Sequence, residues 1–278
     1  MKVKKAIITA GGEGTRLLPC SAFIPKEMFP ISNIPAIDFA INECVAAEIS
    51  EIFIVVSEKK ELLVKYLSYK QINEPNLKTI KICFVPQCKG RGTAKAIESC
   101  RKFIGKEPFF VIFPDEIVFE SKATGLSILS AFDTSGKSVL GLKPIPQKEC
   151  RKYGIISYDK ISKTGLYEIT DVVEKPEKNA PSNLALCGRY IFSPEIFEIL
   201  EKISLHGKEY FLTDAIKKLA KLGKVCGYEL TEKIYDAGNP RDYVAAQKAY
   251  LDYLDKSVEK ELKTGDEEII QRKDGGLL

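Results

Sequence analysis

The sequence predicts an α/β fold with a mixed, mostly parallel central sheet that is flanked by helices, and a smaller antiparallel portion. Three observations support this prediction. The first half of the chain alternates between short apolar runs and segments with helical spacing. Beyond residue 143, apolar runs follow one another without long helices between them. Glycine-rich or acidic segments follow several of the apolar runs, where open parallel sheets bind their ligands.

In the first half, strands are expected where a short apolar run is bounded by polar or turn-forming residues. These strands are predicted at residues 5–10, 51–57, 80–85, 108–118 and 138–142. Apolar side chains at helical spacing predict helices at residues 35–47, 62–67, 93–103 and 125–132. Repeated strand–helix–strand units build a parallel sheet with helices on both faces, so this half is predicted to be Rossmann-like.

The second half is predicted to be antiparallel in part. Strands are expected at residues 153–159, 167–176, 184–193 and 225–230, and helices at 194–202, 212–222 and 241–262. The last dozen residues are polar and end in glycines, so we expect them to fray. No linker divides the chain, and we expect one domain over residues 1–278 with portions 1–143, 144–240 and 241–278.

Composition excludes several classes of protein. The net charge is only +4 and no block of like charges occurs, which disfavours nucleic acid as a partner. No apolar segment reaches the roughly 20 residues of a membrane span. His206 is the only histidine and the cysteines are scattered, so a structural zinc site is not expected. Scattered cysteines in a chain of this length indicate reduced thiols and a cytoplasmic location.

The first predicted strand runs into a glycine-rich loop, GGEG at residues 11–14, followed by Arg16. The loop lacks the third glycine of a dinucleotide-binding fingerprint and the Gly-Lys-Ser/Thr of a P-loop. Pro19 and Pro25 disfavour an immediate long helix, so the loop should continue to Lys26. Such glycines can simply serve a tight turn. With two cations in the same loop, they also suit a clamp for a polyphosphate.

The stretch GGEGTRLLP, followed by PKEM, resembles the signature of sugar-1-phosphate nucleotidyltransferases (sugar-nucleotide pyrophosphorylases), and more narrowly of bacterial UTP–glucose-1-phosphate uridylyltransferases. Further matches occur in order along the chain: INEC (41–44), FPD (113–115), YGI (153–155), VVEKP (172–176), GRY (188–190), LTDAI (212–216) and AGNP (237–240). The resemblance implies a glycosyltransferase-A-like nucleotidyltransferase fold and transfer of UMP from UTP to glucose-1-phosphate with Mg²⁺. It also implies a homo-oligomer, either dimer or tetramer.

The resemblance further implies a role for individual residues. Portion 1–143 would mainly bind nucleotide and portion 144–240 mainly sugar phosphate, followed by a C-terminal helix and tail. The implied nucleotide-binding residues are Ala10, Gly11, Gly12, Gly14, Thr15, Glu27, Gln87 and Gly92. The implied catalytic cations are Arg16, Lys26 and Lys175, and the implied sugar-phosphate-binding residues are Gly154, Glu174 and Lys175. Asp115 and Asp236 would hold the Mg²⁺ ion, because magnesium binds a few carboxylates together with substrate phosphates.

Some of these assignments have simpler alternatives. A lone aspartate after a strand usually serves a turn or a helix cap. Glu174 and Lys175 are neighbours, and neighbouring residues on a strand point to opposite faces. Both can face one ligand only if the strand ends or bulges there, which Pro176 favours. Arg189 and Asp214 are weaker candidates, as an orienting residue and a helix-start residue.

The sequence also departs from the family pattern. It has SNIPAI after PKEM instead of a segment with Asp-Lys-Pro, and GRGTA (90–94) instead of GLGHA. These departures leave a glucose-1-phosphate thymidylyltransferase, or an enzyme using another hexose phosphate, as the nearest alternative. A regulatory relative that binds nucleotide without turnover is a further alternative. A nicotinamide oxidoreductase is disfavoured by the missing fingerprint.

Overall fold

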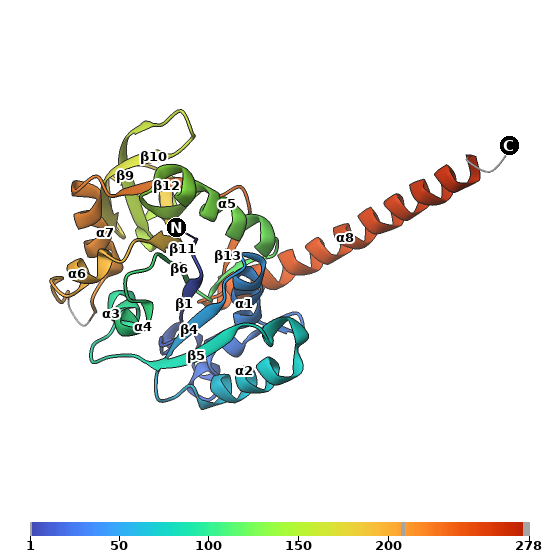
Figure 1. Ribbon diagram of the computed structural model, residues 1–278, viewed down its shortest axis with the longest axis horizontal. Helices are drawn as coiled ribbons and strands as arrows, with labels where there is room; N and C mark the ends of the chain where they lie inside the picture. Colours follow the sequence, from blue (N-terminus) through green and yellow to red (C-terminus); the bar gives the residue numbers. More distant parts are fainter. Residues whose placement is uncertain (1, 207–208, 275–278) are drawn as a thin grey trace.

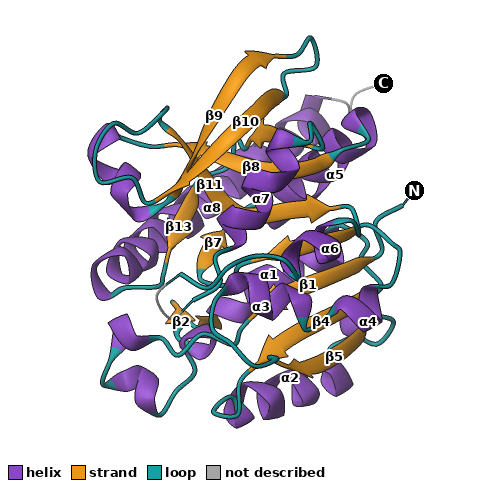
Figure 2. Cartoon of the chain, turned by 90° about the vertical axis from the view of Figure 1, so that its left-hand side faces the viewer, coloured by secondary structure: helices purple, strands orange, loops and turns teal. Residues whose placement is uncertain are grey.

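The computed structural model of the chain describes residues 2–206 and 209–274, with side chains described for 2–120, 122–206 and 209–257 (Figure 1). Helices cover both faces of a central sheet, and the C-terminal helix α8 (Pro240–Asp274) extends away from this body. Figure 2 shows the sheet from a second direction. In the described part of the chain, no helix combines the length and the apolar composition needed to cross a bilayer.

Four parallel strands form the first half of the sheet. In spatial order they are β5 (Lys81–Pro86), β4 (Glu51–Val56), β1 (Lys5–Thr9) and β6 (Phe109–Ile112). Ile7 of β1 pairs with Phe53 on one side and with Val111 on the other. β1, β4 and β6 are buried along almost their whole length, which explains why their sequences are continuous apolar runs.

The second half of the sheet is mixed. It contains β11 (Leu184–Phe192), β8 (Ser138–Pro144), β12 (Val225–Glu229), β10 (Tyr167–Glu174) and β9 (Gly154–Ile161), in this order beyond β6. β11 is antiparallel to both β6 and β8, whereas β12 is parallel to β8. A pairing of Ala185 with Ile155 joins β11 to β9 and closes these five strands on themselves.

Alternate side chains of the sheet pack against two sets of helices. Ile8 and Ile54 belong to the core beneath α1 (Ala36–Ala46), α2 (Glu61–Asn73) and α5 (Ser121–Ser135). Ile7 and Phe53 belong to the core on the opposite face. The helices on that face are α3 (Thr93–Glu98), α4 (Arg101–Ile104), α6 (Ile196–Leu200) and α7 (Leu212–Lys221).

A smaller apolar core lies where α8 meets the body. Two short antiparallel pairs contribute to it, β2 (Pro30–Ile31) with β3 (Ile34–Pro35), and β7 (Glu116–Val118) with β13 (Ile234–Asp236). Phe39 of α1 packs edge-on against Tyr250 of α8, at 5.4 Å between ring centroids. The core therefore joins the start of α8 to segments that flank the candidate site.

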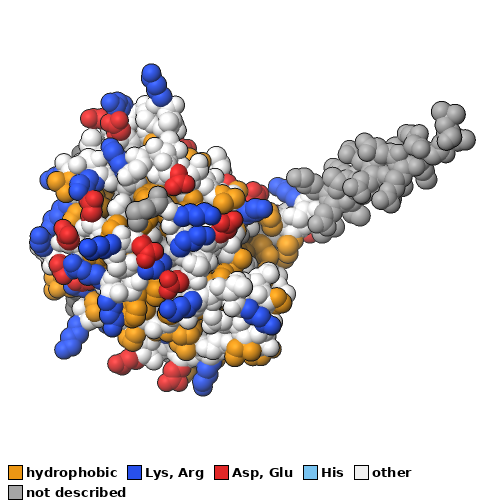
Figure 3. All heavy atoms as spheres, in the orientation of Figure 1, with side chains coloured by type: hydrophobic (Ala, Val, Ile, Leu, Met, Phe, Trp, Pro, Cys, Tyr) orange, Lys and Arg blue, Asp and Glu red, His pale blue; other side chains and the backbone are white. Residues whose placement is uncertain are grey.

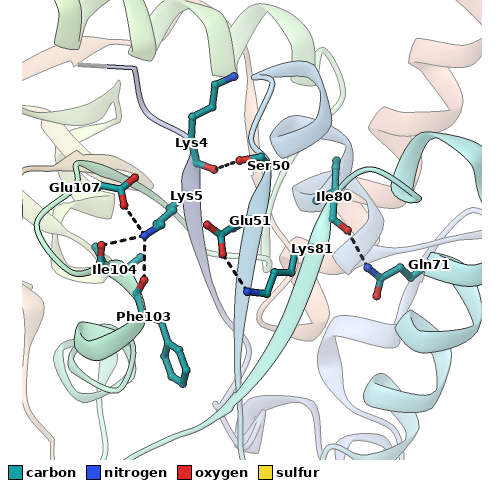
Figure 4. A network of polar contacts seen from close by, with 10 residues as sticks. All are labelled: Lys4, Lys5, Ser50, Glu51, Gln71, Ile80, Lys81, Phe103, Ile104 and Glu107. Carbon is teal, nitrogen blue, oxygen red and sulfur yellow. Dashed lines mark hydrogen bonds and ion pairs between the residues drawn. The ribbon is translucent and has the colours of Figure 1, made fainter.

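Lysine side chains tie the amino ends of the parallel strands to their surroundings (Figure 4). Lys5 donates to the carbonyls of Phe103 and Ile104 at the end of α4, at 3.1 and 3.2 Å, and to Glu107 at 2.6 Å. A cation at the C-terminus of a helix satisfies carbonyls that have no partner within the helix. Elsewhere on the surface, acidic and basic side chains are interspersed on the face that Figure 3 shows.

The structure confirms the α/β fold and the mixed sheet, and corrects several predicted elements. The sheet is mostly parallel only in its first half, because β11 inserts between β6 and β8 in the opposite direction. The predicted helix 93–103 is two helices, α3 and α4. The predicted strand 108–118 breaks into β6 and β7 around Pro114, which cannot donate to a strand ladder.

Two further corrections concern the last part of the chain. β13 was not predicted, because it is only three residues long. Helix α8 continues past 262 to Asp274, through part of the tail that was expected to fray. Its last residues are rich in glutamate and lysine, which are good helix formers. The expectation for residues 275–278 falls outside the described residues.

Candidate active site

The predicted site segments lie at one edge of the parallel sheet. The glycine loop follows β1, the Gln87–Gly92 segment follows β5, and Asp115 follows β6. Because β1, β4, β5 and β6 are parallel, their carboxyl ends meet at this edge. The sheet thus brings together three segments that are far apart in the sequence.

The glycine loop packs closely against two of the predicted side chains. A Cβ atom at Gly11 would lie 2.2 Å from Gln87 Oε1, so a larger residue there would displace the end of the Gln87 side chain. At Gly12, an added Cβ would lie 3.5 Å from Lys26 Cε. Gly14 has a φ of +67°, which glycine adopts without strain, and its carbonyl accepts the Ser21 hydroxyl at 2.7 Å. The loop therefore folds back on itself and brings Lys26 to its beginning.

The rest of the loop contains short helical turns instead of a long helix. They are η1 (Thr15–Leu17), η2 (Cys20–Ala22) and η3 (Lys26–Met28). This confirms the prediction that the loop continues to Lys26. Thr15 and Arg16 are exposed on η1, whereas Ala10 is fully buried and its N–H donates to Val55 at 2.9 Å. Of these three residues, only Thr15 and Arg16 thus present their side chains to solvent.

The two predicted metal ligands lie beside each other. β7 pairs with β13 so that Glu116 lies opposite Asp236, and the Ala237 N–H donates to the Asp115 carbonyl at 2.7 Å. An added Cβ at Gly238 would lie 2.9 Å from Arg16 Nη2, 3.0 Å from Asp236 Oδ1 and 3.1 Å from Asp115 Oδ2. Gly238 therefore marks the point where the side chains of Arg16, Asp115 and Asp236 converge.

Lys26 joins this cluster through an ion pair with Asp115. Burial favours the neutral form of both groups. The Asp115 and Glu27 carboxylates nevertheless raise the pKa of Lys26 above its usual value. The Lys26 ammonium likewise lowers the pKa of Asp115, against the effect of burial. Both groups are thus held in their charged forms.

Asp236 has the opposite shift. Burial raises the pKa of Asp236, and the nearby negative charges of Asp115 and Glu116 raise it further. The Gly238 N–H, which donates to Asp236 Oδ1 at 2.6 Å, and the Arg16 guanidinium partly offset this effect. A cation bound between the two aspartates would favour the ionised form of Asp236.

Glu27, a predicted nucleotide-binding residue, is buried with 1% of its surface exposed. Its Oε2 accepts the ammonium of Lys60, also buried, at 2.5 Å. The pair fastens η3, and with it Lys26, to the start of α2. The Glu27 side chain is directed into the protein and not toward the surface of the site, and its contribution to nucleotide binding stays a prediction.

The segment around Gly92 is held by a neighbouring loop. The Tyr210 N–H donates to the Arg91 carbonyl at 2.9 Å, and an added Cβ at Gly92 would lie 2.3 Å from the Tyr210 carbonyl oxygen. Arg91, where this sequence departs from the family pattern, forms an ion pair of 3.1 Å with Glu13 of the glycine loop. The loops after β1 and β5 are thus in direct contact.

The predicted sugar-phosphate residues form a second group. β10 ends at Glu174, and Lys175 has a φ of +44°, so the strand ends where the sequence required it to. Lys175 Nζ lies 3.3 Å from Glu174 Oε1, which places both side chains on the same side. An added Cβ at Gly154 would lie 3.4 Å from Glu174 Oε2 and 2.9 Å from Thr213 Cγ2.

Sequence reasoning assigned no role to Glu116, Lys143 or Thr213. Lys143 Nζ lies 3.4 Å from Glu116 Oε1 and 4.4 Å from the centroid of the Tyr153 ring. Burial alone would lower the pKa of Lys143, but the Glu116 carboxylate raises it. The Tyr153 carbonyl in turn accepts the Lys175 N–H at 3.0 Å. Lys143 and Tyr153 thus connect Glu116, next to Asp115, to Lys175 of the sugar-phosphate group.

Three motif matches contain polar residues whose roles the sequence reasoning did not work out. The INEC and GRY segments contain Glu43 and Arg189, which form a fully buried ion pair of 3.0 Å. Thr213, in LTDAI, has a buried hydroxyl with no hydrogen-bond partner in the described part of the chain. A charged or polar residue inside an otherwise apolar element is the sequence signal that points to such positions.

The donor set at Gly238 suits magnesium. Two carboxylate oxygens, Asp115 Oδ2 and Asp236 Oδ1, both approach Gly238, and carboxylates are the protein ligands that this ion prefers. Among the described side chains (2–120, 122–206 and 209–257), no three His, Cys, Asp or Glu residues gather into a metal site. A two-carboxylate site of this kind would need substrate phosphates to complete the coordination.

Several known proteins have similar sequences or structures. A UTP–glucose-1-phosphate uridylyltransferase of Bacillus subtilis is 37% identical over 263 residues, covering 87% of this chain and 89% of that protein. UTP–glucose-1-phosphate uridylyltransferase 2 of Staphylococcus saprophyticus is 36% identical over 282 residues, covering 94% and 96%.

A crystal structure of UDP-glucose pyrophosphorylase complexed with UDP-glucose superposes with a TM-score of 0.83 at 33% identity, covering 90% of this chain and 99% of that one. Residues 5–253 match the model of the nucleotidyl transferase family. The chain therefore belongs to the nucleotidyl transferase family.

Proposed function

We propose that the protein is a UTP–glucose-1-phosphate uridylyltransferase, which makes UDP-glucose and pyrophosphate from UTP and glucose-1-phosphate. One observation carries this proposal: Arg16, Lys26, Asp115 and Asp236 converge at the carboxyl edge of the parallel sheet, beside the glycine loop. The names of the similar proteins favour the same reaction.

In this reaction, a phosphate oxygen of glucose-1-phosphate attacks the α-phosphorus of UTP in line. The bond between the α-phosphorus and the bridging oxygen breaks, and its electron pair leaves with pyrophosphate. The nucleophile is already an anion, so the site needs no histidine or serine to activate it. The main task of the protein is to place two anions together and to stabilise the charge that moves to the leaving group.

Each group of residues would serve one part of this task. The N–H groups of the glycine loop would bind phosphate oxygens, and Arg16 and Lys26 would pair with the triphosphate and the departing pyrophosphate. Lys175 would pair with the sugar phosphate, and Glu174 would accept hydrogen bonds from sugar hydroxyls. Asp115 and Asp236 would hold a magnesium ion, which would supply positive charge to offset the negative charge of the substrate phosphates.

The same proposal covers nucleotide recognition and the organisation of the chain. Gln87 and the backbone of Gly92 would recognise the pyrimidine, since an amide both donates and accepts. Portion 1–143, with its Rossmann-like parallel strands, would mainly bind nucleotide. Portion 144–240 would mainly bind sugar phosphate within the same glycosyltransferase-A-like domain. We expect a homo-oligomer in the cytoplasm; the eight cysteines, all within the described part, are free, which fits a reducing compartment.

The direct test is release of pyrophosphate from UTP and glucose-1-phosphate in the presence of Mg²⁺. We expect turnover that depends on all three. A panel that replaces UTP with dTTP, and glucose-1-phosphate with other hexose phosphates, tests the substrates separately. Faster turnover with dTTP would move the protein to the thymidylyltransferases. Absence of turnover with every pair would refute the enzymatic function.

A further inference from the structure

The segment that carries Asp115 is a tight turn between β6 and β7. The Phe113 carbonyl accepts the Glu116 N–H at 3.2 Å, so residues 113–116 form a turn with Asp115 at its third position. Strand β11 holds this turn from one side. The Phe113 N–H donates to the Gly188 carbonyl at 2.8 Å, and the Gly188 N–H donates to Glu116 Oε2.

Arg189, the next residue of β11, contacts the same turn with its side chain. Arg189 Nη1 donates to the Phe113 carbonyl at 3.2 Å, the same oxygen that closes the turn. The other edge of the guanidinium faces Glu43 of α1, with Nε at 3.0 Å and Nη2 at 3.0 Å from Oε2. The rigid guanidinium therefore links helix α1 to the carbonyl two residues before Asp115.

The burial of this pair calls for an explanation beyond stability. Arg189 and Glu43 each have 0% of their surface exposed. Removing two charges from water carries a large desolvation cost, and apolar residues of similar volume often give equal or greater stability. The pair touches neither the glycine loop nor the sugar-phosphate group in any contact found among the described residues. Its one contact toward the site is the Phe113 carbonyl.

We propose that the Arg189–Glu43 pair is a positioning device that fixes the turn at Phe113 and thereby aims the Asp115 carboxylate at its cation. This inference rests on the proposed function, because it takes Asp115 as a ligand of the metal. Neither Arg189 nor Glu43 touches substrate. Residues that orient a metal ligand change metal affinity or activity by about 10–100-fold when they are removed.

The test replaces both members of the pair with apolar residues of similar size, Arg189→Met together with Glu43→Leu. This double variant leaves no unpaired buried charge, so it is the version expected to fold. The affinity of the enzyme–UTP complex for Mn²⁺ should weaken about tenfold or more. The EPR signal of free Mn²⁺ measures this affinity, with a sample of UTP and Mn²⁺ without enzyme as the blank. The KM for glucose-1-phosphate should stay unchanged, because Lys175 and Glu174 are outside the turn.

A matched control removes another buried pair. Lys70 of α2 and Asp38 of α1 form an ion pair of 2.7 Å, and no contact found among the described residues joins either residue to the turn at 113–116. In the control variant, Lys70 is replaced by Met and Asp38 by Leu. This control should leave Mn²⁺ affinity as in the wild type. If it weakened Mn²⁺ binding as much as the Arg189–Glu43 replacement, the effect would be general loosening and the proposal would be overturned.

A single variant, Arg189→Lys, decides the question if the double variant does not fold. Lysine keeps the charge but cannot reach Glu43 and the Phe113 carbonyl in the same forked geometry, so the same loss of Mn²⁺ affinity is expected. Wild-type Mn²⁺ affinity in either folded variant would overturn the proposal. Failure of the wild-type enzyme to turn over any substrate pair would instead refute the proposed function.

Discussion

Replacing Gly238 with alanine tests the candidate site without removing any charged group. The added methyl group would lie within 2.9–3.1 Å of Arg16, Asp236 and Asp115. Ordinary van der Waals contact begins near 3.4 Å, so each neighbour must give by a few tenths of an ångström. Arg16 is exposed and can turn away, whereas both carboxylates are partly buried, Asp236 being held by the Gly238 N–H and Asp115 by the Lys26 ammonium.

A displacement of this size at the two proposed metal ligands should weaken Mg²⁺ binding more than it weakens the fold. A shift of about 1 Å in a reacting group can cost about 100-fold in rate. A few tenths of an ångström at two ligands should therefore raise the Mg²⁺ concentration for half-maximal activity about tenfold, which corresponds to about 1.4 kcal/mol. Pyrophosphate release as a function of Mg²⁺ concentration measures this change, and thermal unfolding shows whether the variant is folded.

The control substitution is Gly136→Ala at the end of α5. Gly136 has a φ of +63° and no atom within 4 Å of an added Cβ, so alanine strains the backbone without crowding anything. This should destabilise the protein by about 1–2 kcal/mol and leave the Mg²⁺ dependence unchanged. Wild-type Mg²⁺ dependence in folded Gly238→Ala protein would refute the convergence of the two aspartates on one cation.

Three further predictions follow from the charged groups. Lys26→Ala and Asp115→Ala should each reduce kcat about 100-fold or more with the fold retained in circular dichroism; near-normal rates would show that the assignments are wrong. The pKa of Asp236 is raised above its ordinary 3.8, so Mg²⁺ should bind with full affinity at a pH above this raised pKa and should lose affinity as the pH falls through it. Measuring the dissociation constant of Mg²⁺ as a function of pH checks this. A loss of affinity that begins only below pH 3.8 would contradict it. Lys60→Met should lower the free energy of unfolding in urea by about 3–5 kcal/mol, because it leaves Glu27 buried without its ion-pair partner. A decrease of less than about 1 kcal/mol would show that Lys60 and Glu27 do not form a charged pair.

The order of strands and helices could be predicted largely because local patterns determine it. Continuous apolar runs identified β1, β4 and β6, which are buried on both faces. The position of β11 could not be predicted, because pairing between distant strands depends on contacts that no local pattern records. β13 was missed for the same reason: three residues carry no periodicity, and only pairing with β7 makes them a strand.

The residues of the candidate site could be predicted where the residue type itself indicates a chemical role. The glycines, the loop cations and the two aspartates were found from the sequence, and their proximity in the structure agrees with that grouping. The supporting residues were found only in part, because their role lies in geometry. Arg189 was named only as a weaker, orienting candidate, and the sequence alone does not reveal that it reaches Phe113 and Glu43 at once.

The pairing of β7 with β13 also sets the time at which the site can form during synthesis. Asp115 belongs to the first half of the chain, and its partner Asp236 is made only near the end. The parallel strands β5, β4, β1 and β6 can pair as soon as they leave the ribosome, since N-terminal parts generally fold first. Until β13 is made, a nascent chain has the glycine loop and Asp115 but lacks Asp236. If Asp236 is the metal ligand proposed above, the chain should not consume UTP before its synthesis is almost finished.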